Sequence, residues 1–573
     1  MDTVSELLEA RLRAAFAQVA PGTDPVLRPS ERADFQANGA LALARVLGRS
    51  PREVAAQVAA VLDLGGLATV EVAGAGFLNV TLTPEFLDAR LHALLGDARL
   101  GVSRSDPPHR VVIDYSAPNV AKEMHVGHLR STVIGDALAA LERLGGEEVI
   151  ARNHVGDWGT PFGMLIEHLV ERGEDAGAAE LAIGDLTAFY QAARAAFDAD
   201  EGFRERSRAR VVALQAGDPE TRRLWRRLVD QSVAYFSEVY RRLGVTLSAA
   251  DIRGESSYND DLAGVVAELD RQGLLADSDG ARCVFPPGFT NREGEPLPLI
   301  VQKRDGGFGY AATDLAAVRD RVERLGADRL LYVVGTPQAQ HFAMVFAVAR
   351  RAGWLPDTVR CEHVAFGNVL GADHKMLKTR SGSTVKLIDL LDEAVERARR
   401  ALEERGAAID AAQRDQLAVQ IARAAIKYAD LSTERQRDYV FDLDRMVAFE
   451  GDTGPYLQYA HTRVRSILRR AADAGADAHP EAFVVGEGAS RTLATSLLGW
   501  PDAVAAARAT AQPHRLCGYL FGLAQDFTAF YEACPVLSAP LALRAERLAL
   551  CELTARTLAQ GLAVLGIEAP ERM

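Results

Sequence analysis

Around residue 110, the pattern of hydrophobic positions predicts a strand, a helix and a second strand. Val111-Val112-Ile113 is a short β-branched run of the kind that forms a buried parallel strand. Gly145-Gly146 ends the helix that follows, and Val149-Ile150 is the next hydrophobic run. Between them, hydrophobic residues recur on one helical face at Leu129, Val133, Ala137, Leu141 and Leu144. We therefore expect a βαβ unit with parallel strands.

The same patterns divide the rest of the chain into segments. An amphipathic helix is predicted over residues 4–16, and glycines lead into an alternating strand over 77–82. From about 166 to 235 the sequence is helical and rich in arginine, for which a solvated helix face is the default interpretation and contact with an RNA stem the competitor. Beyond residue 386 nearly all the sequence has helical periodicity. We predict a doubly wound, mostly parallel α/β domain, a small N-terminal α/β domain and an all-α C-terminal bundle.

Composition and charge narrow the class of protein. Hydrophobic residues make up 48% and charged residues 25% of the 573-residue chain, as in ordinary globular proteins. The sequence has no apolar run long enough to span a membrane and no apolar signal region at its start, so we expect a cytoplasmic protein with no membrane partner. The five cysteines form no CxxC pair, which suits a reducing compartment. The net charge of −13 argues against nonspecific nucleic-acid binding, so any RNA contact must come from local basic clusters.

The candidate chemistry begins where the predicted helix follows the first strand. His125 and His128 share one helix face, and Gly127 between them has no side chain to keep a ligand from the backbone. A helix start at the carboxyl end of a parallel strand presents free N–H groups and favours phosphate. This motif alone leaves open a chance histidine pair or half a zinc site, although no further ligands at metal spacing are evident.

The longer string around these histidines changes that balance. The residues Pro118, Asn119, Lys122, His125, Gly127 and His128 closely resemble the HIGH signature of class I aminoacyl-tRNA synthetases, in the form found in arginyl-tRNA synthetases. Lys375-Met376-Leu377-Lys378-Thr379 resembles the second signature of that class, the KMSKS loop, with Leu377 and Thr379 in place of its serines. The chain's last residues also look like the end of that family, so the resemblance covers the whole length.

The resemblance implies ATP-dependent ligation of L-arginine to its tRNA through an arginyl-adenylate, on a Rossmann-like catalytic domain. His125, His128, Lys375 and Lys378 would be catalytic, and Lys122, Pro118, Gly127 and Met376 would bind ATP. Arginine would be bound by Asn119, Glu255, Tyr310, Asp314 and Gln338, although Gln340 leaves the register at Gln338 open. Carboxylates suit this task because they accept two hydrogen bonds from a planar guanidinium.

The resemblance also implies a division of labour along the chain. Residues 1–105 would bind the tRNA elbow, and residues 106–385 would form the catalytic domain, with the insertion at about 166–235. A helical segment at 386–450 would connect the catalytic domain to the anticodon-binding domain at 451–573. Tyr459 and Arg463 lie in that last segment and would contact tRNA, since aromatic and cationic groups together suit unstacked bases. Mg²⁺ would arrive with ATP, no structural metal is expected, and the protein would be a monomer. The family forms its adenylate only when tRNA is bound.

Three rival hypotheses share parts of this evidence. A class I paralogue could ligate an amino acid to a small molecule, but the intact C-terminal half argues against it. A nucleotidyltransferase would share residues 110–150 and would need neither flanking domain. A non-enzymatic RNA-binding protein would have no reason to keep His125, His128 and Lys378 together. A charging assay with a panel of amino acids separates these hypotheses.

Overall fold

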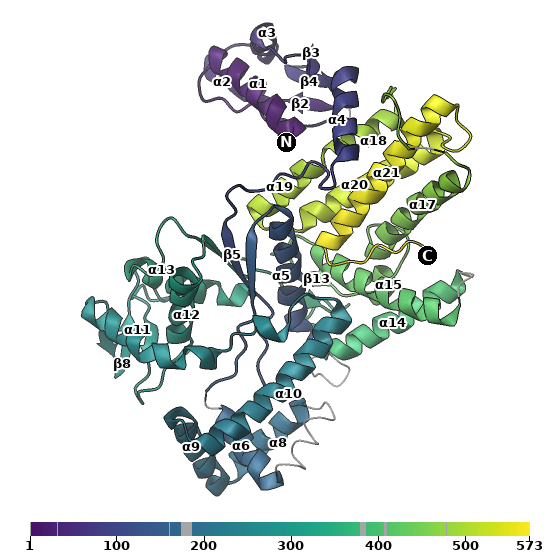
Figure 1. Cartoon of the computed structure of the whole chain (residues 1–573). Coiled ribbons are helices and arrows are strands. Elements are labelled where there is room, and N and C mark those ends of the chain that lie inside the picture. The colour runs from purple at the N-terminus through teal and green to yellow at the C-terminus, as the bar shows by residue number, and fades with distance from the viewer. Residues whose placement is uncertain are drawn as a thin grey trace. The chain divides into compact units, whose positions relative to one another are not determined.

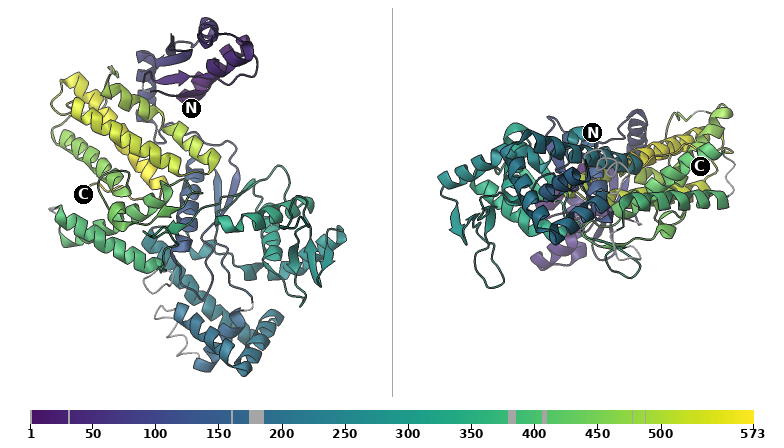
Figure 2. Two further views of the ribbon diagram at one scale, coloured as in Figure 1. Left: turned by 180° about the vertical axis from the view of Figure 1, so that it is seen from behind. Right: turned by 90° about the horizontal axis from the view of Figure 1, so that it is seen from below.

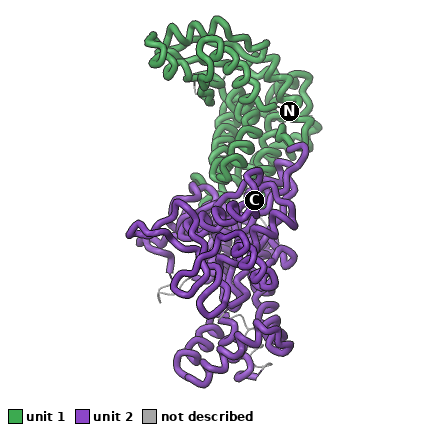
Figure 3. Tube along the Cα trace, turned by 90° about the vertical axis from the view of Figure 1, so that its left-hand side faces the viewer, with its two compact units in different colours: residues 1–104, 448–564, 568–573 green, residues 105–447, 565–567 purple. Residues whose placement is uncertain are grey.

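The computed structural model describes residues 2–30, 32–159, 161–173, 186–378, 385–405, 410–476, 478–486 and 488–573 (Figure 1). The chain forms two compact units (Figure 3). Unit 1 consists of residues 1–104, 448–564 and 568–573, and unit 2 of residues 105–447 and 565–567. Each unit is therefore assembled from stretches of chain that are far apart in sequence.

A four-stranded parallel sheet lies at the centre of unit 2, in the order β11–β10–β5–β6. Its strands are β5 (Arg110–Asp114), β6 (Glu148–Arg152), β10 (Arg329–Tyr332) and β11 (Arg360–His363). The chain turns toward β6 after β5 and toward β11 after β10, so the strand order reverses between β5 and β10. Asp114 pairs with Tyr332, which aligns the carboxyl ends of these two strands. Open sheets bind their ligands at such a switch point.

Helices connect the strands and bury them. The helix α5 (Val126–Leu144) joins β5 to β6, and α13 (Ala339–Arg351) joins β10 to β11. One core contains Val112 of β5, Leu330 of β10 and side chains of α11 (Asn259–Arg271), α12 (Tyr310–Arg319) and α13. Residues 249–338 also contain a small antiparallel sheet, formed by β7 (Ala276–Ser278), β8 (Ala281–Val284) and β9 (Leu299–Gln302). The short helical turns of the same range are η1 (Ala249–Asp251), η2 (Glu255–Tyr258) and η4 (Thr336–Gln338), which are 3₁₀ turns, and the π turn η3 (Asp320–Arg324).

A group of helices is inserted after β6. It contains α6 (Pro161–Arg172), α8 (Leu186–Ala199), α9 (Glu201–Ala216) and α10 (Pro219–Leu243). Figure 1 and the left view of Figure 2 show these helices gathered apart from the group α11–α13. The longest, α10, begins with Asp218 as N-cap and Pro219 at its first position and ends at Gly244 in the left-handed conformation.

The rest of unit 2 lies on both sides of the second signature in the sequence. It contains β12 (Val369–Leu370), α14 (Leu387–Glu404), α15 (Ala411–Leu431), β13 (Tyr439–Val440) and α16 (Leu443–Met446), and β12 pairs with β13 in parallel. Arg130 of α5 is buried against this region. Its guanidinium lies 3.2 Å from the Asp430 carboxylate of α15 and donates to the carbonyl of Arg437 at 2.8 Å. The ion pair fixes α5 to α15, and the hydrogen bond fixes α5 to the segment just before β13.

Unit 1 combines the two ends of the chain. The N-terminal part has the antiparallel sheet β1–β2–β4–β3, formed by β1 (Leu27–Pro29), β2 (Phe35–Ala37), β3 (Ala68–Ala73) and β4 (Phe77–Leu82). Its helices are α1 (Val4–Val19), α2 (Gly39–Leu47), α3 (Pro51–Val61) and α4 (Pro84–Gly96), and the C-terminal helices are α17 (Gly454–Asp473), α18 (Ala489–Leu498), α19 (Trp500–Thr510), α20 (His514–Ala533) and α21 (Leu541–Val564). Arg491 of α18 binds the Asp34 carboxylate at 2.6 Å, and Ser5 donates to Asp502 at 2.8 Å, so side chains tie both parts together.

The predicted fold class is confirmed: a doubly wound parallel sheet, an N-terminal α/β part and a helical C-terminal part are all present. The domain limits predicted from the sequence stay predictions, since the compact units group the two ends of the chain together. Within the described ranges, no helix has the length and apolar character needed to cross a membrane.

Candidate functional site

The two signature histidines lie at the N-terminus of α5, beside the switch point of the sheet. His125 is the N-cap residue, and its ring centre lies 4.1 Å from that of His128. The Nδ1 atom of His125 accepts the backbone N–H of Gly127 at 3.0 Å, and Nδ1 of His128 accepts the N–H of His125 at 3.1 Å. A neutral imidazole that accepts at Nδ1 has its proton on Nε2. Each ring is therefore left with an Nε2–H donor.

Both rings are also kept neutral by their surroundings. Burial and then the positive charge of Lys122 lower the pKa of His125. Burial, with added repulsion from His125 and Lys122, lowers the pKa of His128 to about 3. At neutral pH the pair can therefore donate hydrogen bonds to phosphate oxygens without a prior change of protonation state.

Gly127 is required by the first histidine. A Cβ atom at this position would lie 2.7 Å from Cε1 of the His125 ring. The sequence predicted that this glycine opens the backbone to a ligand. The structure adds that it leaves room for the His125 ring, which accepts the backbone N–H of Gly127.

The segment before α5 runs beside the turn that follows β6. Val120 donates to the carbonyl of Gly156 at 3.0 Å, and Gly156 donates to the carbonyl of Pro118 at 3.2 Å. A Cβ at Gly156 would lie 2.3 Å from Oδ1 of Asn119, so glycine allows that side chain to lie against the turn. Lys122 is exposed, and its Nζ lies 4.4 Å from the centre of the Tyr190 ring of α8.

A cluster of carboxylates forms the second part of the site. Burial, with repulsion from Asp157 and then Asp314, raises the pKa of Glu255 to about 8. These residues come from three places, because Asp157 follows β6, Glu255 begins η2 and Asp314 lies in α12. The structure thus brings together Glu255 and Asp314, which lie 59 positions apart in the sequence. An uncompensated acidic cluster of this kind favours a cationic ligand.

Two residues of this cluster were not among the predicted site residues. Nε2 of His341 lies 2.6 Å from Oδ2 of Asp314. Asp157 accepts the backbone N–H of Ser256 at 2.8 Å and its hydroxyl at 2.6 Å, which fixes the turn that carries Glu255. A signal was present in both cases, since Asp157 lies in a string shortly after the hydrophobic run Val149-Ile150 and His341 lies in one shortly after the hydrophobic run at 330–334.

The remaining predicted arginine ligands lie on the rim. Tyr310 is the first residue of α12, one turn before Asp314, and its side chain is 75% exposed. Gln338 ends η4 just before α13, and both it and Gln340 are exposed. The assignment of Gln338 to the arginine site therefore stays a prediction.

The second signature forms a hairpin after β12. Leu377 donates to the carbonyl of Val369 at 3.2 Å, and Gly371 donates to the carbonyl of Lys375 at 2.8 Å. Lys375, Met376 and Lys378 are exposed on this hairpin, whereas Thr379 lies outside the described residues. Among the described residues, no hydrogen bond or ion pair joins either lysine to His125 or His128.

The other end of that loop is attached to the first signature. Val126 donates to the carbonyl of Val385 at 3.1 Å, and Leu387 donates to the carbonyl of Met124 at 2.9 Å. The Lys386 ammonium lies 2.8 Å from the buried Glu123 carboxylate. The first signature is therefore hydrogen-bonded to residues 385–387, the segment that follows the second signature in the sequence.

The predicted tRNA contacts lie in unit 1. Tyr459 of α17 is 36% exposed, and the Arg463 guanidinium lies 4.6 Å from the centre of the Tyr531 ring of α20. The neighbouring Arg465 instead binds the Glu571 carboxylate at 2.9 Å. Tyr459 and Arg463 thus remain the candidates of this helix for stacking on bases.

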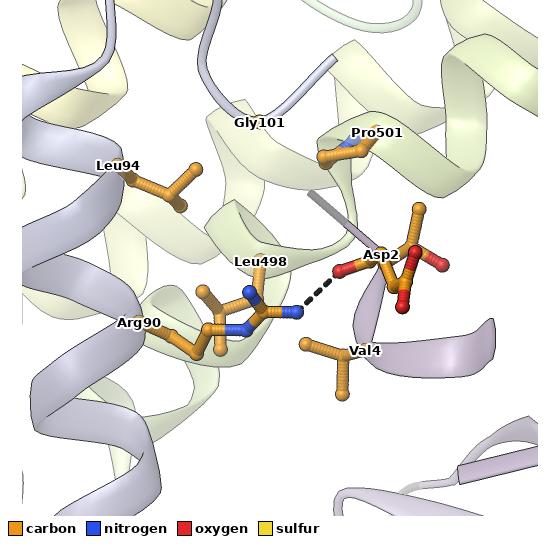
Figure 4. A pocket seen from close by; sticks show the side chains of 8 residues that line it. Asp2, Val4, Arg90, Leu94, Gly101, Leu498 and Pro501 are labelled. Atoms are coloured by element: carbon orange, nitrogen blue, oxygen red, sulfur yellow. Dashed lines mark hydrogen bonds between the residues drawn. The ribbon is translucent and has the colours of Figure 1, made fainter. Parts of the chain in front are cut away.

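Unit 1 also contains a small cavity, shown in Figure 4. Val4, Leu94, Leu498 and Pro501 contribute apolar side chains, and Arg90 donates to the carbonyl of Asp2. None of the predicted site residues lines it. The cavity therefore adds nothing to the site in unit 2.

Comparison with known proteins agrees with this geometry. Residues 90–443 match the family model of the class I tRNA synthetase (R) catalytic domain, residues 457–573 that of the DALR anticodon binding domain, and residues 2–82 that of the arginyl tRNA synthetase N-terminal domain.

Relatives match over the whole chain. An arginine–tRNA ligase from Thermobifida fusca is 54% identical over 569 residues, which cover 99% of this chain and 98% of that protein. One from Laribacter hongkongensis is 48% identical over 576 residues, with all of both chains covered. The crystal structure of arginyl-tRNA synthetase from Plasmodium falciparum superposes over all of both chains with a TM-score of 0.86 at 27% identity. With the histidine signature at the switch point of a parallel sheet, and with this identity over its full length, the chain belongs to the arginyl-tRNA synthetase family of class I aminoacyl-tRNA synthetases.

Proposed function

We propose that the protein ligates L-arginine to its tRNA at the expense of ATP, through an arginyl-adenylate. The observation that carries this proposal is the partly buried acidic cluster of Glu255, Asp157 and Asp314 at the sheet edge that also holds the histidine pair. A guanidinium is the amino-acid side chain that such a cluster neutralises and binds with directional hydrogen bonds.

Adenylate formation needs alignment more than a protein nucleophile. The carboxylate of arginine is already ionised and attacks the α-phosphate of ATP, and pyrophosphate leaves. The Nε2–H groups of His125 and His128 donate to the phosphate oxygens on which negative charge grows. Lys375 and Lys378 would close over the β- and γ-phosphates, whose charge the Mg²⁺ of the nucleotide also neutralises.

The remaining ATP contacts would come from the segment before α5 and from the hairpin. Pro118, Gly127 and Met376 would contact the nucleotide, and Lys122 would meet its phosphates. The exposure of Lys122 and Met376 supports this assignment, because both side chains are accessible to a ligand.

Arginine would lie with its guanidinium between Glu255 and Asp314. Asn119 and Gln338 would hold its α-amino and carboxylate groups, and Tyr310 would cover the side chain. A bound guanidinium would lower the pKa of Glu255, so that this carboxyl would release its proton to solvent. In the free protein, burial and then the charges of Asp157 and Asp314 raise that pKa to about 8. His341 would keep Asp314 oriented toward the substrate.

The tRNA would be read by the C-terminal helices of unit 1 and would bring its acceptor end to unit 2. Tyr459 and Arg463 would stack on unpaired bases. We propose a cytoplasmic monomer, with residues 1–105 at the tRNA elbow and 451–573 at the anticodon.

A charging assay with the purified protein, ATP, Mg²⁺, tRNA and a panel of amino acids tests the reaction. Arginine alone should be attached, with lysine and citrulline charged at least about 10⁴-fold less efficiently, because each would leave buried acceptors unpaired. Charging of another amino acid, or transfer to a small molecule, would contradict the proposal.

Two variants test the arginine pocket. Glu255→Gln and Asp314→Asn keep the shape of the side chain and remove its charge, so each should raise the KM for arginine by about 2–4 kcal/mol in free-energy terms. The KM for ATP should change little. Equal effects on both substrates would remove these two residues from the arginine pocket.

A further inference from the structure

The segment that joins β5 to α5 has an unusual backbone. Ser116, Ala117 and Ala121 have φ angles of 74°, 44° and 59°, in the left-handed region that side chains other than glycine disfavour. Residues persist there only when surrounding contacts hold them, and such residues cluster at functional sites. Asn119 and Lys122, which lie in or beside this segment, are proposed ligands of arginine and ATP.

Contacts from α5 and from the residue after β6 hold the first half of the segment. The backbone N–H of Ser116 donates to the Ser131 hydroxyl at 2.9 Å, and that of Ala117 donates to Oδ1 of Asn153 at 3.0 Å. The Thr132 hydroxyl lies 2.9 Å from the Ser116 hydroxyl and 2.7 Å from the carbonyl of His128. Thr132 therefore links the strained segment to the backbone of the second signature histidine.

The remaining contacts come from the inserted helix α10. The Ser232 hydroxyl accepts the backbone N–H of Ala121 at 2.9 Å. The Tyr240 hydroxyl lies 2.7 Å from that of Ser116 and accepts from Nδ2 of Asn153 at 2.9 Å. Both α10 side chains are buried, and burial raises the pKa of Tyr240 to about 12, so it stays a neutral hydroxyl.

A third contact extends this pattern to the acidic cluster. Nε1 of Trp225 donates to the carbonyl of Asp157 at 2.7 Å. Trp225, Ser232 and Tyr240 are spaced by seven and eight residues, which puts them on one stripe of α10. Arg222, Arg223 and Arg226 of the same helix are exposed. One stripe of α10 thus contacts the substrate-binding segments, while its arginines face solvent.

We propose that Ser232 and Tyr240 are positioning residues, which hold the segment 116–121, with its left-handed residues Ser116, Ala117 and Ala121, in the conformation that the ATP and arginine sites require. Neither side chain touches substrate; each acts through the backbone or hydroxyl that it binds. The proposal rests on the proposed function, since Asn119 and Lys122 are the groups that the segment presents. It makes the geometry of the site depend on a helix outside the nucleotide-binding fold.

A matched pair of serines on α10 tests the first residue. The Ser232 hydroxyl donates to the carbonyl of Leu228 at 2.9 Å, and the Ser237 hydroxyl donates to that of Val233 at 2.8 Å. Ser232→Ala and Ser237→Ala therefore lose the same kind of contact within the helix, but only Ser232→Ala frees Ala121. Arginine-dependent ATP–pyrophosphate exchange, measured with tRNA present, should fall at least tenfold in Ser232→Ala and less than twofold in Ser237→Ala.

Glycine at position 121 provides a rescue that a merely structural role would not produce. Glycine adopts positive φ without strain, so the segment would need less support. Adding Ala121→Gly to Ser232→Ala should restore exchange to within about threefold of the wild-type rate. A double variant as slow as Ser232→Ala, or equal rates in the two serine variants, would overturn the proposal.

If Ser232→Ala does not fold, Tyr240→Phe provides a second test of the proposal. It removes one hydroxyl and keeps the ring, and it should raise the KM for ATP and arginine together because Ser116 loses one of its supports. Unchanged KM values for both substrates in a folded Tyr240→Phe protein would also overturn the proposal. Failure of the proposed function would look different, since the wild-type protein itself would then not charge arginine.

Discussion

At the scale of single residues, His125 and His128 owe their chemistry to the backbone around them. Each ring accepts a main-chain N–H at Nδ1, and this leaves the outward Nε2–H as a donor. Burial lowers the pKa of both rings, so the pair stays neutral across the physiological range. Fixed neutral donors suit a reaction in which charge grows on phosphate oxygens, because they need no rearrangement as the transition state forms.

Lys378 differs from the histidines because it lies exposed on a hairpin. It should meet the pyrophosphate charge mainly in the transition state. Lys378→Ala should therefore lower kcat by about 10² or more, with a smaller effect on the KM for ATP. Lys303→Ala, at an exposed lysine in another loop, serves as the control in steady-state exchange assays. Near-normal turnover of Lys378→Ala would take this loop out of the mechanism.

The acidic cluster predicts how arginine binding depends on pH. The pKa of Glu255 is raised to about 8, so in the free protein this carboxyl is protonated below pH 8 and ionised above it. A guanidinium needs the ionised form, so the KM for arginine should fall as pH rises and level off above about pH 8. Between pH 6.5 and 8.5 the decrease should be about 20-fold.

The same pH series on Glu255→Gln provides the control. Glutamine has no proton to lose, so the variant should bind arginine weakly with a nearly flat profile. A wild-type KM that is constant from pH 6.5 to 8.5 would mean that Glu255 is already ionised in the free protein.

Most residues of the candidate site could be predicted from the sequence, but the residues that hold them in place could not. Glu255 and Asp314 were predicted, and the structure brings them together. His341 and Asp157 were missed because their importance lies in contacts across the fold, with Asp314 and Ser256, which no local spacing shows. The sequence likewise gives no sign of the positive φ of Ala121, because alanine usually avoids that conformation.

At the scale of elements, the buried Arg130–Asp430 ion pair joins α5 to α15. Arg130 also donates to the carbonyl of Arg437, two residues before β13, and its guanidinium lies 5.3 Å from the centre of the Tyr439 ring. Because β13 pairs with β12 at the base of the lysine hairpin, one side chain connects the helix of the first signature to the strand of the second. A buried pair of this kind is costly to break from one side.

Arg130→Met should therefore destabilise the protein by about 3–5 kcal/mol, since Asp430 would be left buried without its partner. The double variant Arg130→Met/Asp430→Leu should recover much of that loss. Urea denaturation followed by tryptophan fluorescence measures both. Arg194→Met, which breaks the exposed Arg194–Asp198 pair of α8, should cost less than about 1 kcal/mol. A double variant no more stable than Arg130→Met would contradict this account.

The hydrophobic periodicity of the sequence predicted some helices and strands and missed others. The βαβ unit near residue 110 is confirmed, with α5 ending at Leu144 just before the predicted glycines. The antiparallel sheet β7–β8–β9 was not predicted, because three strands of three or four residues are too short to show a period. The pairing of β12 with β13 was equally inaccessible, since each contains two residues and 68 positions separate them.

At the scale of the whole molecule, the resemblance implies that arginine activation requires tRNA. ATP–pyrophosphate exchange with arginine should be negligible without RNA and restored by cognate tRNA, because a bound tRNA would favour the closed form of the lysine loop. The exchange rate at saturating arginine and ATP without RNA is the measurement. A rate within about tenfold of the tRNA-containing reaction, which is a barrier difference of about 1.4 kcal/mol, would contradict the requirement.

The division of unit 1 between both ends of the chain has a consequence for how the protein is made. Ribosomes complete residues 1–104 first, and residues 105–447 must follow before the helices that share their unit begin to appear. At about 5–20 residues per second, this wait lasts roughly 20–70 s. The N-terminal part has a hydrophobic core of its own, around Leu12, Phe16 and Val54, and so can fold during that time. Asp34, which accepts the Leu82 N–H within this part, must nevertheless wait for its ion-pair partner until Arg491 emerges, so the nascent chain carries an incomplete surface through most of its synthesis.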